Sequence, residues 1–187
     1  MRLVISAGIA GAFLLARGRP EGLALVETTP AGAWRSFIAA AICLPAFFAL
    51  RVFGWADEVP ANGILRPLAA ELIGYVLGWT AFALASLPLA QAWGRLGLWP
   101  RFIAAWNWMN VVHYLLWIAL ALPPLLGLSG VLVQGVTLAG FGYALWLEWF
   151  IARHALGLSG LRATTIVILD LATGIFLSGL VQRLSMG

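Results

Sequence analysis

The fold of this chain is decided by residues 101–153, which read RFIAAWNWMNVVHYLLWIALALPPLLGLSGVLVQGVTLAGFGYALWLEWFIAR. Two long apolar segments, residues 102–122 and 130–152, flank a short uncharged turn that begins with Pro123 and Pro124. Each is long enough to cross about 30 Å of hydrocarbon, which takes about 20 helical residues. We therefore predict two membrane-spanning helices joined by a tight hairpin, with the proline pair ending the first helix.

Composition places the whole chain in a membrane. Hydrophobic residues make up 63% of the 187 residues and charged residues only 10%, and the mean hydropathy is +0.97. A soluble domain has about a quarter charged residues, so this chain lacks the polar side chains needed to cover a soluble surface. We predict an all-α, polytopic transmembrane helix bundle that forms a single membrane domain over residues 1–187.

Three further apolar stretches, at residues 36–53, 68–92 and 164–180, bring the predicted number of spans to five. Residues 1–35 are expected to form a cytoplasmic or interfacial segment. Its apolar part, residues 1–16, is short and is followed by Arg17 and Arg19, which favours a helix lying in the membrane interface. An extra span and a cleaved signal peptide are the alternatives. Thr29 and Pro30 are typical of a helix start.

The arginines predict how the bundle is oriented. If the N-terminus is cytoplasmic, eight arginines fall on the cytoplasmic side and three, Arg51, Arg66 and Arg183, on the other. The acidic residues Asp57 and Glu58 fall on the side with fewer arginines. The positive-inside rule then places the N-terminus in the cytoplasm and the C-terminus outside. We expect an integral protein of the bacterial inner (cytoplasmic) membrane.

Several polar residues lie inside the predicted spans and form a candidate polar layer. They are Asn107, Asn110, His113, Glu148 and Asp170. Counting inward from the cytoplasmic ends, both asparagines and both acids lie about 6 to 12 Å deep, and His113 about 16 Å deep. A carboxylate facing lipid costs about 2.5 to 3.5 kcal/mol, so Asp170 should face protein. We expect it to bond to Asn107 or Asn110, and Arg153 or Arg162 to reach Glu148.

The polar layer has three interpretations that the sequence leaves open. It is a structural network that joins helices, a path for protons or a solute, or a site for a lipid or a protein partner. A separate feature of the second span is the run of small residues Ala70, Gly74 and Gly78 at intervals of four. Such a stripe favours close helix packing, although chance spacing in a glycine-rich chain gives the same pattern.

Sequence patterns of catalysis and cofactor binding are missing. There is no HExxH, GxSxG, CxxC or P-loop, so we expect no enzyme, no metal and no cofactor. His113 and His154 differ too much in predicted depth to hold one haem. The arginines are scattered singly, which excludes a nucleic-acid surface. The single cysteine, Cys43, is expected to be a buried apolar residue.

The layout resembles the Yip1 family of small integral membrane proteins. The resemblance rests on five spans after a cytoplasmic N-terminal portion, on Arg19-Pro20 before the first span, and on the arrangement of residues 146–153 and 156–163 before a last span with a short tail. It implies a helical bundle without enzymatic chemistry that acts through protein or lipid contacts. It assigns no functional residues.

Two classes of function follow. The first is a non-enzymatic scaffold or accessory subunit that contacts membrane lipids and a protein partner or a second copy of itself. The second is a small proton- or solute-conducting transporter or channel that uses the polar layer in the cytoplasmic half of the bundle. Five unequal spans do not divide into the two repeats common among transporters, which favours the scaffold.

Overall fold

The structure, a computed structural model, describes residues 2–54 and 63–186. Among these residues the only regular secondary structure is helix, and turns connect the helices, which confirms the predicted all-α class. The predicted outer loop with Asp57 and Glu58 lies outside the described residues. The helices, including two short 3-10 segments, are α1 (Arg2–Ala16), η1 (Pro20–Leu25), α2 (Pro30–Ser36), α3 (Ile38–Gly54), α4 (Leu65–Ala92), η2 (Leu96–Leu98), α5 (Trp99–Leu125), α6 (Val131–Leu156) and α7 (Gly160–Met186).

Five helical segments in the described part of the chain are long and apolar enough to cross a membrane, as the sequence predicted. They are Pro30–Gly54, Leu65–Ala92, Leu96–Leu125, Val131–Leu156 and Gly160–Ser185. Each is longer than the predicted span, because a helix continues beyond its apolar window into the interface. Near the C-terminus, for example, α7 continues to Met186 instead of ending at residue 180.

The proline pair does not end α5 where the sequence predicted. Both prolines lie inside the last turn, and the helix ends at Leu125. A proline this close to a C-terminus removes the N–H partners of two earlier carbonyls without stopping the turn itself. The amide of Leu126 then donates to the carbonyls of Leu122 and Pro123 and closes the helix.

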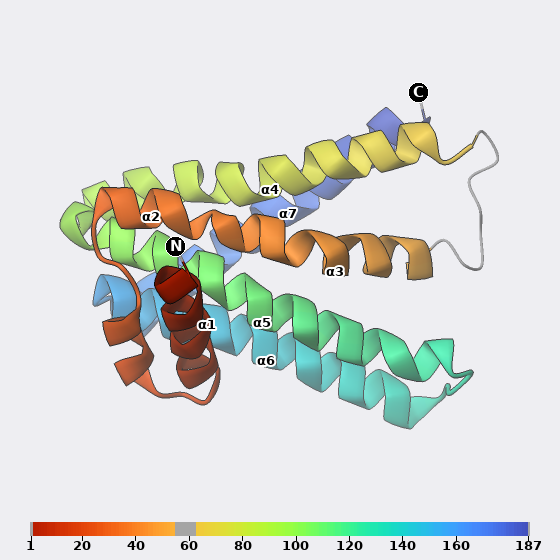
Figure 1. The fold of residues 1–187 in the computed structure, drawn as a ribbon, viewed down its shortest axis with the longest axis horizontal. Helices are drawn as coiled ribbons and strands as arrows, with labels where there is room; N and C mark the ends of the chain where they lie inside the picture. The colour runs from red at the N-terminus through yellow and green to blue at the C-terminus, as the bar shows by residue number, and fades with distance from the viewer. Residues whose placement is uncertain (1, 55–62, 187) are drawn as a thin grey trace.

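The N-terminal helix α1 lies across the long helices of the bundle (Figure 1). Figure 1 shows α1 lying across the long helices near one end, with η1 folded beside it. The hydroxyl of Tyr143 on α6 donates to the carbonyl of Ala16 at 2.5 Å and fixes the end of α1. The side chain of Thr29 accepts from the amide of Gly32 at 3.0 Å, which confirms the predicted helix start. A short helix across the end of a bundle fits the predicted interfacial position.

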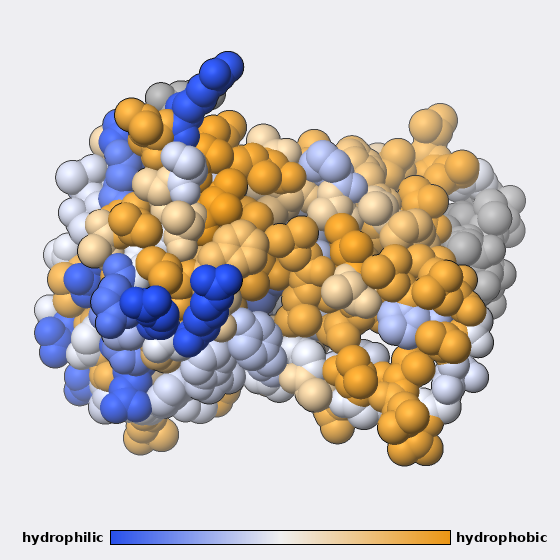
Figure 2. All heavy atoms as spheres, turned by 60° about the horizontal axis from the view of Figure 1, so that its bottom comes forward, coloured by the Kyte–Doolittle hydropathy of each residue, from blue (hydrophilic) through white to orange (hydrophobic). Residues whose placement is uncertain are grey.

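The long helices form two groups. The helices α4 and α7 pack against each other, and α3, α5 and α6 lie side by side below them in Figure 1. Further contacts between α6 and α7 connect the two groups. Figure 2 shows hydrophilic residues gathered at the end that carries α1 and hydrophobic side chains over most of the remaining face. This distribution matches a bundle whose sides face lipid.

Candidate functional site

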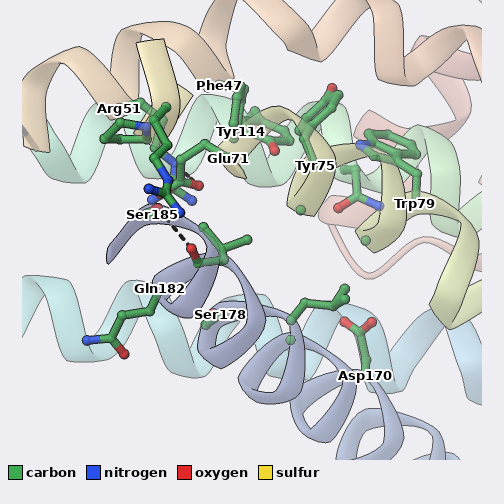
Figure 3. Close-up of a pocket in the computed structure, with 18 of the residues that line it drawn as sticks. Phe47, Arg51, Glu71, Tyr75, Trp79, Tyr114, Asp170, Ser178, Gln182 and Ser185 are labelled. Atoms are coloured by element: carbon green, nitrogen blue, oxygen red, sulfur yellow. Dashed lines mark hydrogen bonds and ion pairs between the residues drawn. The ribbon is translucent and has the colours of Figure 1, made fainter. Parts of the chain in front are cut away.

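A cleft lies between α7 and the side formed by α3, α4 and α5. Its volume is about 920 Å³. Figure 3 shows Asp170 on α7 pointing toward the aromatic side chains across the open space, and Ser178 and Gln182 of the same helix also line the cleft. The opposite side is built by α3, α4 and α5, from the residues Phe47, Tyr75, Trp79, Trp106, Asn110 and Tyr114.

Small residues explain why the cleft stays open beside a tight helix contact. A side chain on Gly74 of α4 would collide with Val181 of α7, so the two helices touch there. One turn further along, Gly78 lines the cleft and has no atom within 4 Å of its Cβ position. Gly174 on α7 is equally open. The predicted packing stripe is therefore partly wrong, because only Ala70 and Gly74 are in tight surroundings and Gly78 faces empty space.

The mouth of the cleft is charged and internally paired. It lies where α3 ends, α4 begins and α7 ends. Arg51 and Glu71 form an ion pair with a nitrogen–oxygen distance of 3.1 Å. The Nε of Arg66 donates to the carbonyl of Leu184 at 3.0 Å. These contacts hold the three helix ends together and place two guanidinium groups at the entrance.

Aromatic rings form one wall of the cleft. The rings of Phe47 and Tyr75 have centroids 4.5 Å apart, and Tyr75 lies 6.1 Å from Trp79 and 6.3 Å from Tyr114. The hydroxyl of Tyr75 donates to the carbonyl of Ala40 at 2.5 Å, which fixes this ring between α3 and α4. The wall is therefore a connected set of ring faces held by its own packing.

Two carboxyl groups meet at the deep end. Asp170 lines the cleft, and Glu148 of α6 is its neighbour. The side chain of Glu148 is 4% exposed, and its Oε1 has no hydrogen-bond partner among the described residues. The prediction that Asp170 faces protein is correct. A carboxyl pair at the bottom of a cleft can bind a cation or hold a proton.

Beyond the acids, aromatic side chains close the bundle. Phe82 and Trp106 stack with centroids 4.5 Å apart, and Phe82 packs against Phe102 at 6.1 Å. Trp79 completes the cluster at 5.8 Å from Trp106. Phe82 and Phe102 are fully buried. We call these four residues the aromatic plug. Trp79 and Trp106 form the inner end of the cleft, and Phe82 and Phe102 lie beyond them toward the end of the bundle that carries α1.

The asparagines do not bond to Asp170 as the sequence predicted. The amide of Asn107 donates to the hydroxyl of Ser36 at 2.7 Å, and the amide of Asn110 donates to the carbonyl of Trp106 at 3.0 Å. Asn107 and Asp170 were predicted to bond because they lie at similar depths in the membrane, but the rotation of α5 about its axis turns Asn107 toward Ser36 of α2. Asn110 does share the cleft with Asp170.

The two arginines that were expected to reach Glu148 contact tryptophan rings instead. Arg153 stacks on the ring of Trp149 with its Cζ 5.1 Å from the centroid, and Arg162 stacks on Trp93 at 5.8 Å. Both remain at the boundary of the bundle, where a guanidinium keeps its contact with water and headgroups. In the part of the chain that the structure describes, neither forms an ion pair with Glu148.

His113, the remaining member of the predicted layer, lines a second, smaller cavity. This cavity has a volume of about 370 Å³ and shares Phe47, Arg51, Asn110 and Tyr114 with the larger cleft. The Nε2 atom of His113 is buried without a hydrogen-bond partner among the described residues. His113 therefore adjoins the cleft but belongs to a separate recess.

Asn110 was predicted from the sequence as part of the polar layer, whereas the aromatic residues beside it in the cleft were missed. Trp106, Asn110 and Tyr114 recur every four residues on α5, and Tyr75 and Trp79 do the same on α4. This spacing puts each set on one face of its helix, and the two sets could have been recognised as facing stripes. The Arg51–Glu71 pair had no comparable signal, because its two residues are on different helices.

Nothing among the described residues brings three His, Cys, Asp or Glu side chains together in a metal-binding group. The chemistry of the cleft therefore comes from carboxyl groups, ring faces and hydrogen-bonding side chains. No protein-family model, curated protein or solved structure matches this chain.

Proposed function

We propose that this integral membrane protein is a small transporter that binds a solute in the cleft between α7 and the helices α3, α4 and α5. One observation carries the proposal, namely that the cleft is continuous from the charged mouth to Asp170. Along α4 it extends from Arg66 to Trp79, which corresponds to about 20 Å of helix. This is more than half the thickness of a bilayer's hydrocarbon core.

The asymmetry of the cleft supports transport. It is open at the mouth and closed by the aromatic plug at the other end, which is the arrangement expected of one state in alternating access. A carboxyl group exposed to hydrocarbon is costly, whereas a hydrated cleft gives Asp170 water contacts at the same depth. Opening the plug while closing the mouth would expose the acids to the opposite side.

The arginine distribution supports an outward-facing mouth. Arg51 and Arg66 at the mouth belong to the side with fewer arginines, so the positive-inside rule places the mouth outside and the aromatic plug toward the cytoplasm. With this orientation we propose location in the bacterial inner membrane.

A scaffold or accessory subunit is the second candidate, without enzymatic activity in either case. It is favoured by the N-terminal half of α6. There Leu132, Val136 and Leu138 are strongly exposed, and Gly135 has no atom within 4 Å of its Cβ position. Such a face allows a helix of a protein partner or a second copy to approach closely. The resemblance to the Yip1 family agrees with this alternative and stays a prediction.

Cysteine accessibility tests whether the cleft is hydrated. In a Cys43→Ala background, Ser178→Cys introduces a thiol that lines the cleft, and Phe176→Cys introduces one on the outward face of the same helix. Thiolates form in water and not in lipid. We expect a membrane-impermeant maleimide added at the mouth side to label Ser178→Cys and to leave Phe176→Cys unlabelled.

A third variant tests for transport. Ser86→Cys places a thiol in a buried position on α4, one turn beyond Phe82 of the aromatic plug. If the plug opens, this thiol is labelled slowly from the side opposite the mouth. Labelling of Ser178→Cys alone would identify a one-sided binding site and contradict transport. An unlabelled Ser178→Cys would show a dry cleft and support the scaffold.

A further inference from the structure

We infer that the cleft binds a small monovalent organic cation, an ammonium-bearing solute, with its charged group between Asp170 and the aromatic wall. The inference rests on the proposed function and adds the chemical class of the solute. It follows from three features of the cleft: a negative charge at the floor, ring faces around it, and a buried hydrogen-bond donor without a partner.

The charge at the floor comes from the pair of Glu148 and Asp170. In the proposed site these two neighbouring acids share one proton and carry a single negative charge, because two adjacent carboxylates repel each other and a bound cation favours the ionised form. Arg51 is engaged by Glu71 at the mouth, and Arg66 bonds to a carbonyl there. The floor charge is thus left to be matched by a ligand with one positive charge.

The aromatic wall distinguishes an organic cation from a metal ion. Tyr75, Trp79 and Tyr114 line the cleft opposite α7, together with Phe47 and Trp106. The negative face of an aromatic ring attracts alkylated ammonium groups, most strongly where water is excluded. A small metal ion instead needs several oxygen ligands, and the described residues bring no group of three metal-binding side chains together.

The unpartnered donor is the indole nitrogen of Trp106. Trp106 lines the cleft and is 5% exposed, and its Nε1 has no hydrogen-bond partner among the described residues. The indole nitrogens of Trp99 and Trp149 are both satisfied, by Ser86 and by the carbonyl of Gly160. A buried donor without a partner is costly, so the ligand is expected to bring an acceptor such as a hydroxyl or carbonyl oxygen.

An ammonium group occurs both in free solutes and in lipid headgroups. The depth of the floor favours a free solute, because Arg66 at the mouth is about 20 Å of helix away from Trp79. The other guanidinium, on Arg51, lies closer to the wall, 5.3 Å from the ring centroid of Phe47, but is already paired with Glu71. The experiment therefore includes a separate lipid arm.

Choline and its neutral carbon isostere, 3,3-dimethylbutan-1-ol, have the same shape and hydroxyl group and differ in charge. Their binding to the full-length protein is measured by isothermal titration calorimetry in phosphatidylglycerol nanodiscs. We expect choline to bind at least about tenfold more tightly than the neutral alcohol. Equal affinities, or no binding of choline, would overturn the inference. Labelling of Ser178→Cys in the same preparation would show that the proposed cleft itself still stands.

Variants locate the site. Asp170→Asn removes the floor charge and is expected to weaken choline binding at least about tenfold. Thr173→Val is the matched control, because Thr173 is on the same helix, donates to the carbonyl of Leu169 on that helix and does not line the cleft.

If Asp170→Asn fails to fold, Trp106→Phe provides a second test, because it keeps an aromatic ring and removes the indole donor. It should weaken binding of choline but not of tetramethylammonium, which has no acceptor, and equal weakening of both would contradict the role of the indole nitrogen.

The lipid arm repeats the choline titration in nanodiscs that contain phosphatidylethanolamine. Unchanged choline affinity supports a free solute as the ligand. Competition by the lipid would overturn that assignment and give the ammonium site to a headgroup.

Discussion

Asn107 illustrates how a polar side chain is accommodated inside this bundle. It is fully buried, and its amide donates to the hydroxyl of Ser36 at 2.7 Å. Ser36 in turn donates to the carbonyl of Ala33 at 2.6 Å. The bond joins the end of α2 to α5 across 71 residues of sequence. A polar pair of this kind stabilises one arrangement of two helices, because each partner is costly without the other.

Removing one partner should therefore destabilise the protein more than removing both. We expect Ser36→Ala to reduce the free energy of unfolding by about 1 to 2 kcal/mol, because the Asn107 amide loses its partner. Thermal unfolding in mild detergent measures the effect, and the double variant with Asn107→Leu completes a mutant cycle. Thr137→Ala, on the exposed face of α6, is the control. Strictly additive effects in the cycle would show that the bond contributes nothing.

Glu148 and Asp170 show a different use of polar groups. Neither acid has an ion pair with an arginine among the described residues, and both are placed where α6 and α7 meet the cleft. Incomplete bonding does not separate the two cases, because both Glu148 Oε1 and Asn107 Oδ1 are buried without a partner among the described residues. The position of Asp170 beside open space, with Glu148 next to it, is the physical reason why we assign the acids to ligand binding and Asn107 to structure.

At the scale of elements, the contact between α4 and α7 depends on one glycine. A Cβ on Gly74 would overlap the side chain of Val181, whereas Gly78 has open space around it. The two helices therefore touch at Gly74, whereas the space beside Gly78 belongs to the cleft. Identical residues four positions apart thus have opposite roles, one in packing and one in leaving room.

Alanine substitutions should separate these roles. We expect Gly74→Ala to destabilise the protein by about 1 to 3 kcal/mol, because the added methyl forces α4 and α7 apart. Gly78→Ala is the matched control and should leave the unfolding temperature nearly unchanged, since its methyl enters the cleft. Adding Val181→Ala to Gly74→Ala should restore part of the loss. Equal effects of the two glycine substitutions would contradict the assigned contact.

At the scale of the whole molecule, the two helix groups and the charged ends imply a defined orientation. Hydrophilic residues gather at the end that carries α1, and the mouth is at the other end. The arginine count predicts that the α1 end is cytoplasmic.

Labelling in oriented membranes tests this orientation. In a Cys43→Ala background, we expect Gly97→Cys in the connection between α4 and α5 to react only from the cytoplasmic side. Arg183→Cys near the end of α7 should react only from outside. Both positions are exposed in the structure, so access is set by the membrane. The reverse pattern would invert the bundle and place the mouth of the cleft in the cytoplasm.

The sequence by itself determined the class of protein and the number of spans. This was possible because hydrocarbon imposes a length and a polarity on every crossing segment, and both can be read from consecutive residues. The helix start at Thr29 and Pro30 was predictable for a similar reason, since the cap acts within one turn. Helix ends were predicted less well, as α5 continues through Pro123 and Pro124.

Only the tertiary structure decided which polar residues meet. Residue counting gives the depth of a side chain along its helix, but the partner depends on the rotation of each helix and on which helices are neighbours. Asn107 and Asp170 were predicted to bond because they share a depth, yet packing turns Asn107 toward Ser36 and brings Asp170 to Glu148. The cleft has the same origin. It exists because α4 and α7 touch at Gly74, whereas Gly78 and Gly174 leave open space between α7 and the aromatic side chains of α3, α4 and α5. That arrangement joins side chains from four helices that no local pattern connects.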